Sequence, residues 1–252
     1  MNKTIDFDLV ADLYDNYVQT DFDIAFFKEL CKEYHNILEL MCGTGRVSLP
    51  LIESGYPLTC VDYSAEMLRV FRRKLDASKH DKIICQDVCN LDLGEQFDLV
   101  MIPFNSIAEI TDAEKRKQAI YSIYRHLLPG GKFFCTLYHP AYRVKSADGN
   151  IKALGKFPLE NDKTLMVTYY NNYSDKDKII SGTQFYEIYD GKNTLIEKRY
   201  LDIRFSVISR DEMQIAASEA GFSLKEVYGD YQGNPYSNES MFMNFLFEKQ
   251  PE

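Results

Sequence analysis

Glycines and acidic residues stand together in one short segment of the sequence, and this combination is suited to binding a ligand. The segment, residues 39–46, reads ELMCGTGR. Its glycines let the backbone come close to a ligand, and the helix expected next offers free N–H groups to a negatively charged group. Asp62 follows the first glycine by about 20 residues, where a carboxylate can accept both hydroxyls of an adenosine ribose. The pattern therefore predicts a site for a ligand that contains adenosine.

Two residues disfavour NAD as that ligand. Ser48 stands where a dinucleotide-binding fingerprint has its third glycine. Glu39 falls at the end of the preceding strand, where its carboxylate would repel a pyrophosphate. An NAD-dependent oxidoreductase is therefore a disfavoured alternative.

Short apolar runs alternate with helical patterns over the first part of the chain, and these elements must position the glycine segment. A helix is expected at 46–54, a second begins with a cap at Ser64, and a third begins with a capping box formed by Thr111 and Glu114. Near-continuous apolar strands between amphipathic helices indicate a parallel sheet covered on both faces. The expected strands are 37–41, 58–61, 83–85, 97–102 and 132–138.

The pattern changes after about residue 140. Residues 141–163 are polar and irregular, which predicts a mobile loop. Three β-rich runs follow and predict an antiparallel meander, with a tight hairpin at Asp190-Gly191 between the second and third. A capping box of Ser209 and Glu212 then begins a helix that ends at Gly221. The β-rich runs are 164–173, 178–190 and 194–208, and two closing strands are expected at 222–231 and 241–249.

Five motifs in this order resemble the class I S-adenosylmethionine-dependent methyltransferases. They are E-x-x-C-G-T-G at 39–45, D-x-S-x-x-M at 62–67, Q-D-V at 86–88, F-D-L-V at 97–100 and L-P-G-G at 128–131. The resemblance implies an α/β, Rossmann-like fold: a mostly parallel seven-stranded sheet with helices on both faces, plus an antiparallel β-meander inserted after strand five. It extends over the whole chain, and residues 104–106 and 229–235 look like a small-molecule subgroup of the family.

The resemblance divides the chain into three parts. Residues 1–140 would form the S-adenosylmethionine-binding core with an N-terminal helical cover. Residues 141–208 would be the inserted loop and meander, acting as a substrate lid or a dimer contact. Residues 209–252 would add the C-terminal helix and two strands that complete the core sheet.

The resemblance also implies which residues surround the cofactor. Glu39 would bind its ammonium end, Asp62 its ribose hydroxyls, and Tyr63 with Met67 would sandwich the adenine, although Met67 is equally suited to a helix core. Met41 departs from the glycine or alanine common in the family, which would tighten the pocket. The implied cofactor-binding residues are Tyr14, Glu39, Met41, Cys42, Gly43, Thr44, Gly45, Arg46, Asp62, Tyr63, Met67, Gln86, Asp87, Val88, Pro103, Phe104 and Asn105.

Methyl transfer from a sulfonium is an in-line displacement, so holding the reactants in position can supply about 7–11 kcal/mol without a dedicated catalytic side chain. His139, at the end of the fifth strand, is a candidate general base, or else a loop histidine bonded to backbone. Tyr14 resembles a family tyrosine that folds over the cofactor near the sulfonium; the alternative is packing in the core.

Substrate choice is expected to lie in the insertion and the terminal loop, where tyrosines concentrate. An aromatic lid could hold a cationic amine or a planar ring. The alternatives are that aromatic residues simply favour strands, or that this sheet forms a dimer interface. The candidate substrate residues are Ser106, Tyr138, Tyr170, Tyr186 and Tyr231.

Composition narrows the function classes. The chain of 252 residues has a net charge of −9, which disfavours nucleic acid and anionic lipid as partners. No apolar run predicts a membrane span, and the scattered cysteines predict a reducing, cytoplasmic location without a metal site; Cys85 and Cys89 lack a second ligand pair. We therefore expect a monomeric or homodimeric methyltransferase acting on nitrogen or oxygen of a small molecule. The alternatives are an RNA or protein methyltransferase and a catalytically silent S-adenosylmethionine-binding interaction protein.

Overall fold

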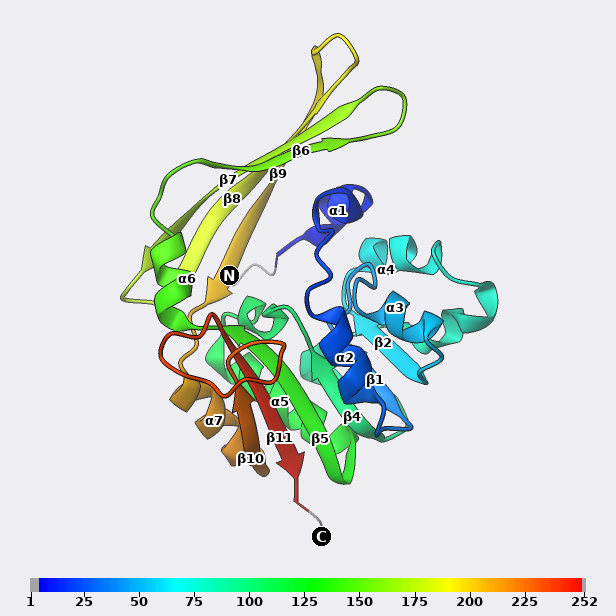
Figure 1. Cartoon of the computed structure of the whole chain (residues 1–252), viewed down its shortest axis with the longest axis vertical. Coiled ribbons are helices and arrows are strands. Elements are labelled where there is room, and N and C mark those ends of the chain that lie inside the picture. The colour runs from blue at the N-terminus through cyan, green and yellow to red at the C-terminus, as the bar shows by residue number, and fades with distance from the viewer. Residues whose placement is uncertain (1–4, 251–252) are drawn as a thin grey trace.

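A seven-stranded, mostly parallel sheet forms the centre of the molecule (Figure 1). The computed structural model describes residues 5–250. The strand order is β10-β11-β5-β4-β1-β2-β3, and only the pairings of β11 with β5 and β10 are antiparallel. The expected fold class is thus confirmed. The strands are β1 (Ile37–Leu40), β2 (Leu58–Asp62), β3 (Ile83–Cys85), β4 (Phe97–Ile102), β5 (Leu127–Tyr138), β10 (Phe222–Tyr228) and β11 (Phe242–Lys249).

Helices cover both faces of this sheet, because the strands are apolar on both sides. One core cluster joins the sheet to α2 (Ile24–Cys31), α3 (Ser48–Glu53) and α4 (Ala65–Arg72). Another joins it to α5 (Ala113–His126) and α7 (Arg210–Glu219). Four short 3-10 helices complete the core: η1 (Phe7–Leu9), η2 (Ala77–Lys82), η3 (Val88–Asn90) and η4 (Ser106–Glu109).

A second sheet, of four antiparallel strands, rises from the end of the core (Figure 1). The expected three-stranded meander is present as β7 (Thr164–Ser174), β8 (Ile179–Tyr189) and β9 (Leu195–Ser206). The prediction of an irregular loop at 141–163 is wrong. This segment contains α6 (Pro140–Ser146) and a fourth strand, β6 (Lys152–Pro158), which pairs with β7 at the edge of the sheet.

Three local predictions also need correction. The cap of α5 is Asp112 rather than Thr111, because the Asp112 carboxylate accepts the N–H groups of Glu114 and Lys115. The hairpin between β8 and β9 is a five-residue loop, 190–194, and its residue with positive φ is Asn193 rather than Gly191. Strand β5 begins at Leu127, ahead of the expected 132, since an irregularity in its pairing with β4 accommodates the proline and glycines.

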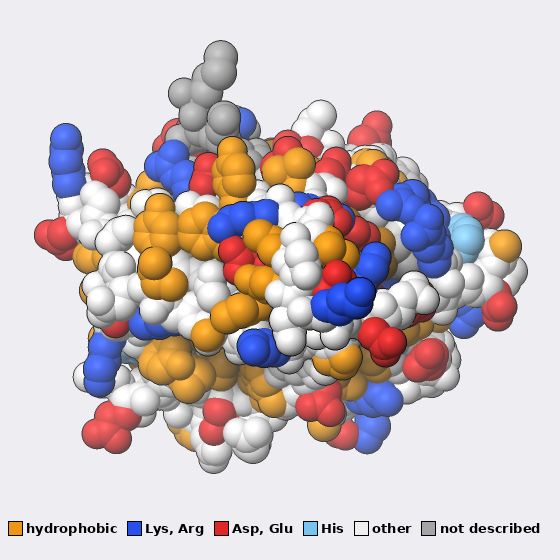
Figure 2. All heavy atoms as spheres, turned by 90° about the horizontal axis from the view of Figure 1, so that it is seen from above, with side chains coloured by type: hydrophobic (Ala, Val, Ile, Leu, Met, Phe, Trp, Pro, Cys, Tyr) orange, Lys and Arg blue, Asp and Glu red, His pale blue; other side chains and the backbone are white. Residues whose placement is uncertain are grey.

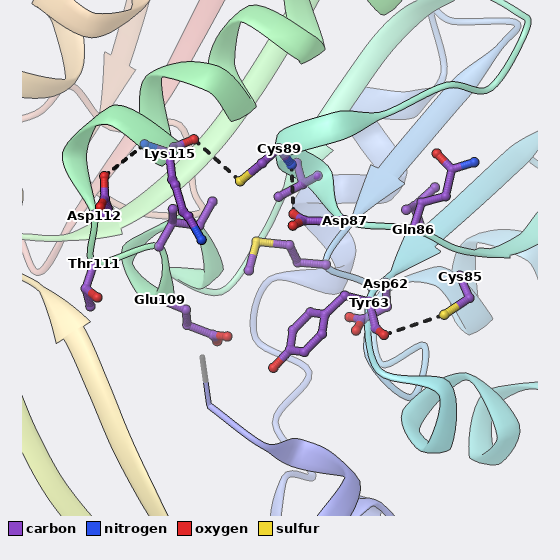
Figure 3. Close-up of a pocket in the computed structure, with 14 residues that line it drawn as sticks. Asp62, Tyr63, Cys85, Gln86, Asp87, Cys89, Glu109, Thr111, Asp112 and Lys115 are labelled. Atoms are coloured by element: carbon purple, nitrogen blue, oxygen red, sulfur yellow. Dashed lines mark hydrogen bonds between the residues drawn. The ribbon is translucent and has the colours of Figure 1, made fainter. Parts of the chain in front are cut away.

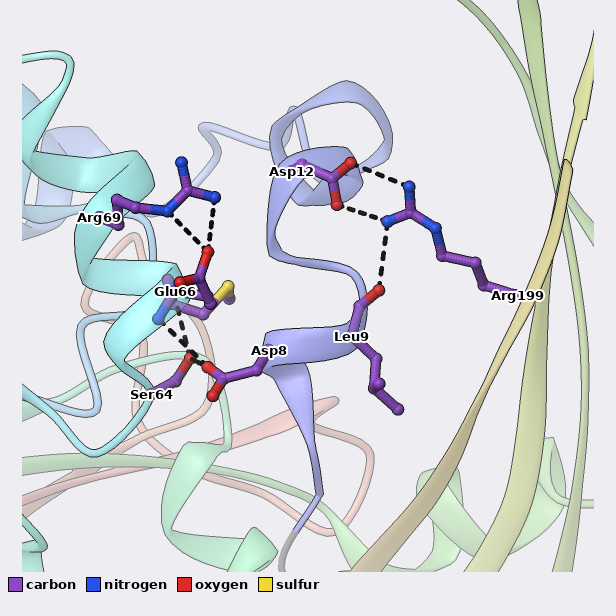
Figure 4. A network of polar contacts seen from close by, with 8 residues as sticks. Asp8, Leu9, Asp12, Ser64, Glu66, Arg69 and Arg199 are labelled. Atoms are coloured by element: carbon purple, nitrogen blue, oxygen red, sulfur yellow. Dashed lines mark hydrogen bonds and ion pairs between the residues drawn. The ribbon is translucent and has the colours of Figure 1, made fainter.

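The N-terminal segment links the four-stranded sheet to the core (Figure 4). Arg199 on β9 makes a bidentate ion pair with Asp12 of α1 (Ala11–Tyr17), and its guanidinium also donates to the carbonyl of Leu9. Asp8 accepts a hydrogen bond from the Ser64 hydroxyl at the start of α4. The N-terminal segment is therefore a cover that is held by the four-stranded sheet on one side and by the start of α4 on the other.

The outer surface on the side of the four-stranded sheet carries hydrophobic side chains interspersed with charges of both signs (Figure 2). Ile151, Ile196 and Tyr200 are among the exposed large hydrophobic residues. No helix within residues 5–250 combines the length and apolarity that crossing a bilayer requires.

Candidate functional site

A cavity of about 420 Å³ lies at the carboxyl ends of the parallel strands (Figure 3). It adjoins the position where the strand order reverses, between β1 and β4, which is where open α/β sheets bind ligands. Its size falls within the range of small-molecule sites. Its lining includes Met41, Val61, Asp62, Tyr63, Gln86, Asp87, Val88, Glu109, Ile110 and Lys115.

A smaller cavity of about 40 Å³ lies against the glycine segment. Met41 lines both cavities, so the two adjoin at this residue. Met41 has a φ of 57°, a conformation that non-glycine residues rarely adopt and that costs of order 1–3 kcal/mol. Such strain often marks a functional site. The smaller cavity is lined by Tyr14, Glu39, Met41, Cys42, Gly43, Thr44, Arg46, Val47, Pro103, Phe104 and Ser106.

Asp62 connects the second strand to the glycine segment. One of its carboxylate oxygens accepts the N–H of Gly43 at 2.8 Å, and the other accepts the N–H of Ser64 at 2.8 Å. Burial raises the pKa of this carboxyl, and the backbone donors oppose that effect. The carboxylate is thereby held rigidly at the wall of the larger cavity, with lone pairs left for a ligand.

Glu39 is buried beneath the smaller cavity and has a specific partner. The Ser48 hydroxyl donates to its carboxylate at 2.7 Å. Burial raises the pKa of Glu39 to about 8, although Ser48 and Arg46 act in the opposite direction. Ser48, which the sequence presented only as a missing glycine, is thus the residue that positions this carboxylate.

The Arg46 side chain closes one side of the smaller cavity and is held there by two neighbouring residues. Its guanidinium forms a bidentate pair with the fully buried Asp23, at 2.6 and 2.7 Å. The guanidinium carbon also lies 4.3 Å from the centroid of the Phe104 ring. Phe104 and Asn105 both have positive φ, which turns the chain sharply after β4 and brings Phe104 into the cavity wall. The rigid pairing with Asp23 leaves Arg46 poorly suited to move during a reaction.

Tyr14 comes down from α1 into the smaller cavity, as the resemblance implied. Burial raises the pKa of its hydroxyl, so the phenol stays protonated near neutral pH, and the nearest charges include Glu109, Arg46 and Asp62. With a cavity this narrow, Tyr14 or Phe104 must shift before the amino-acid end of a ligand can enter. Tyr14 is therefore part of a cover over the smaller cavity.

Most of the expected cofactor-binding residues reach one of the cavities, but three do not line either. Gly45 packs against Phe71, Met67 lies beneath Gly43 in the core, and Asn105 is buried with its side-chain oxygen accepting the N–H of Tyr138 at 3.0 Å. Met67 therefore matches the helix-core interpretation in this structure. Met67 thus supports the glycine segment from below.

The structure does not bring His139 to either cavity. It caps α6, where its Nδ1 accepts the N–H of Ala141 at 3.2 Å, and its ring lies against Tyr236. This arrangement is the backbone-bonded loop histidine that was the alternative prediction. A general base, if the reaction uses one, has to be another residue.

Two of the five candidate substrate residues are structural, and their assignment to the substrate site is wrong. Tyr231 is buried among Phe22, Phe26, Phe27 and Phe242 and bonds to the Thr136 hydroxyl. Tyr186, on β8, is fully buried between the four-stranded sheet and the N-terminal segment. Packing, rather than ligand contact, explains both side chains.

The other three candidates lie in different places. Ser106 lines the smaller cavity. Tyr138 ends β5 and lies between the Arg143 guanidinium and the Phe242 ring. Tyr170 accepts a hydrogen bond from Thr183 on the neighbouring strand.

Tyr186→Phe is expected to lower the free energy of unfolding by about 1 kcal/mol while leaving ligand affinity unchanged. The Tyr186 hydroxyl bonds to Tyr17 at 3.0 Å and to the side-chain oxygen of Gln184 at 2.7 Å, and it touches neither cavity. Urea unfolding and calorimetric titration would measure the two effects. A large loss of ligand affinity without a loss of stability would contradict the structural role.

No pattern in the sequence pointed to Glu109, whose side chain lines the larger cavity. It falls at the end of η4, outside every motif, and the packing of η4 against β5 and β9 brings it to the site. Burial, together with the nearby Asp62 carboxylate, raises the pKa of Glu109 to about 8. Within residues 5–250, no group of His, Cys, Asp and Glu side chains is arranged to hold a metal ion, and Cys85 and Cys89 are free thiols.

Comparison with known proteins agrees with this geometry. Residues 37–131 match a family model described as a methyltransferase domain. The cypemycin N-terminal methyltransferase of a Streptomyces species is 29% identical over 85% of this chain and 83% of its own. The CcbJ methyltransferase of Streptomyces caelestis has a TM-score of 0.79 at 21% identity, with 99% of both chains covered. The sugar N-methyltransferase KedS8 of a Streptoalloteichus species has a TM-score of 0.77 at 20% identity, over 96% of this chain and 92% of its own. The two structural likenesses establish a shared fold.

The residues present also fit S-adenosylmethionine. Asp62 at the wall of the larger cavity suits a ribose, and the buried carboxylate of Glu39 suits an ammonium group at the glycine segment. The larger cavity would hold the adenosine end of that cofactor, and the adjoining smaller cavity would hold its amino-acid end. Residues 37–131 therefore form a methyltransferase domain, the chain has the fold of the class I S-adenosylmethionine-dependent methyltransferases, and S-adenosylmethionine is the cofactor that its site fits.

Proposed function

We propose that this protein transfers a methyl group to a nitrogen or oxygen atom of a small molecule. The observation that carries the proposal is the pair of adjoining cavities, the smaller of which is covered by Tyr14 of the N-terminal segment. Cavities of this size suit a small acceptor better than an RNA or a folded protein, and the net charge of −9 opposes RNA binding. A relative named as the cypemycin N-terminal methyltransferase and a structural neighbour named as a sugar N-methyltransferase support the same proposal.

The cofactor would supply a methyl group on an already activated leaving group, and the protein's task is to hold the reactants in line. The Asp62 carboxylate would accept the ribose hydroxyls, and Glu39 would bind the ammonium end. Tyr14, Arg46 and Phe104 would close the smaller cavity and exclude water. Positioning and desolvation are therefore the main contributions that this chain makes to the rate.

The N-terminal cover also indicates a role for the four-stranded sheet. Its inner face packs on α1 through a third hydrophobic cluster that includes Val10, Leu13 and Leu201. The ion pair between Arg199 and Asp12 strengthens the same contact. The sheet thus holds the helix that carries Tyr14, so we propose that it acts on the reaction through the cover.

Asp62→Ala tests the cofactor site that the proposal requires. The variant loses the carboxylate that would bind the ribose and leaves the N–H groups of Gly43 and Ser64 without their acceptor. We expect the affinity for S-adenosylmethionine to fall by at least about 30-fold, the size of one or two lost hydrogen bonds to a charged group. Isothermal titration calorimetry with S-adenosylmethionine, S-adenosylhomocysteine and NAD would measure it.

Asp98→Ala is the matched control, because the Asp98 carboxylate also accepts two backbone N–H groups, those of His35 and Asn36, but lies outside the cavities. It should lower stability and leave the affinity for the cofactor unchanged. Binding of NAD alone by the unmodified protein would overturn the proposed function. Transfer of labelled methyl to a panel of small amines, phenols and carboxylates would separate an enzyme from a silent binding protein.

A further inference from the structure

Glu109 is a carboxylate that the cofactor site does not require. Its side chain lines the larger cavity, and within residues 5–250 no hydrogen bond or ion pair satisfies it. Asp62 already faces the ribose position, and Glu39 already faces the amino-acid end. Burying an uncompensated carboxylate is costly, so Glu109 has no evident structural purpose. A bound cation would supply the missing partner.

The surroundings of Glu109 place it near the boundary of the two cavities. Its carboxylate and the Tyr63 hydroxyl point toward each other across the larger cavity (Figure 3). Tyr14, in the smaller cavity, has Glu109 as its strongest electrostatic neighbour and is also influenced by Arg46 and Asp62. The sulfonium joins the adenosine and amino-acid ends of the cofactor, so this boundary is where the methyl group would lie.

We propose that Glu109 binds the ammonium group of the methyl acceptor and takes its proton, which makes the acceptor an amine. This inference rests on the proposed function and names its substrate class. The N–H bond of the ammonium breaks as the proton moves to a Glu109 oxygen, and the electron pair stays on nitrogen. That lone pair forms the new N–C bond while the C–S bond breaks and its electrons remain on sulfur.

The raised pKa of about 8 suits this role. A carboxyl with that pKa accepts a proton more readily than an ordinary glutamate, and the cation of the substrate favours its ionised form on binding. The groups that share its surroundings are Asp62, Tyr14 and Tyr63, together with Lys115 on the cavity wall. No other described residue in this wall combines a carboxylate, a lack of partners and closeness to Tyr14.

Sinefungin offers a probe that needs no knowledge of the natural acceptor. An amine-bearing carbon replaces the sulfonium and its methyl in this analogue, so the amine stands close to where a substrate nitrogen would lie. S-adenosylhomocysteine has no cation at that position. The ratio of the two dissociation constants, measured by calorimetry at pH 9, therefore reports whether a negative side chain faces the reacting centre.

We expect the unmodified protein to bind sinefungin more tightly than S-adenosylhomocysteine, and Glu109→Gln to reduce that ratio by about tenfold or more, the size of one charge-assisted hydrogen bond. The affinity for S-adenosylhomocysteine should change less than about threefold, since its thioether carries no charge at the position that Glu109 would face. Glu114→Gln removes the same charge from an exposed position on α5 and should alter neither value.

Three results would overturn the proposal. An unchanged ratio in Glu109→Gln would show that the carboxylate does not face the reacting centre. An equal loss for both ligands would make Glu109 a cofactor-binding residue. Failure of the unmodified protein to bind any of these ligands would overturn the proposed function itself. This outcome differs from the first two, in which the unmodified protein binds the ligands and only the effect of Glu109→Gln contradicts the inference. Thermal unfolding of Glu109→Gln at the same pH would show that the variant is folded.

Discussion

Gly45→Ala is expected to lower the free energy of unfolding by about 3–5 kcal/mol and to abolish measurable binding of S-adenosylmethionine. A Cβ atom at this position would lie 2.3 Å from a carbon of the Phe71 ring, and Gly45 has a φ of +84°. Phe71, on the buried face of α4, is fully enclosed in the core, so the ring has no room to withdraw. The glycine segment would have to lift away from the helix, and Gly43 and Arg46 would move with it.

Gly55→Ala separates the two causes of the expected loss of stability, which are the steric contact with Phe71 and the strain of a positive φ. Gly55 has a nearly identical φ of +88°, but no atom lies within 4 Å of the Cβ position. It should therefore cost only about 1–2 kcal/mol, the strain of a left-handed conformation, and leave cofactor affinity intact. Urea unfolding and calorimetric titration of both variants would give the two values. Equal losses of stability would show that the contact with Phe71 does not matter.

The parts of the fold that the sequence predicted are those fixed by local pattern. The apolar runs of β1, β2 and β4 are buried on both faces, and such runs are recognisable without a partner. Caps such as Ser64 and Ser209 act within three residues of themselves. The glycine segment and Asp62 were predictable for the same reason, because one motif contains both the turn and its ligand groups.

The parts that the sequence did not predict depend on distant packing. Strand β6 is half exposed, includes Gly155 and two lysines, and is extended only because it pairs with the edge of β7. The hydrogen bond from Ser48 to Glu39 joins a helix to a strand, and no motif in the sequence predicts it. Tyrosine-rich composition could not distinguish the buried Tyr186 and Tyr231 from ligand contacts, since both roles use the same side chain.

Glu39→Gln is expected to weaken binding of S-adenosylmethionine by about 30-fold or more and, at pH 9, to stabilise the folded protein. The amide has the shape of the carboxylate, and its oxygen can still accept the Ser48 hydroxyl, whose bond to Glu39 is 2.7 Å long. It cannot supply the negative charge that an ammonium group requires. Loss of affinity therefore follows from charge and not from a change of shape.

Glu39→Gln weakens cofactor binding but stabilises the fold at pH 9, because the pKa of Glu39 is raised in the folded protein. The folded-state pKa of Glu39 is about 8, against an ordinary value of 4.5, so the folded protein holds this proton more tightly than the unfolded chain does. The resulting stability is fully present below about pH 4.5 and is lost as the pH rises through about 8, when the buried carboxyl ionises. One pKa unit corresponds to about 1.4 kcal/mol, so the loss reaches up to about 5 kcal/mol.

Glu39→Gln has no such proton to lose, so its unfolding free energy should fall less between pH 5 and pH 9 than that of the unmodified protein. Arg46, Asp23 and Asp62, the charged groups that influence Glu39, remain in the variant, as does Glu109. Ser48→Ala is the complementary control: it keeps the charge but removes the donor that lowers the pKa, so cofactor binding should require a higher pH. A variant Glu39→Gln that bound S-adenosylmethionine normally, or that was less stable at pH 9, would show that this carboxylate serves the fold. The expected pair of opposite effects would show instead that the protein keeps a destabilising charge in its core because the cofactor needs it.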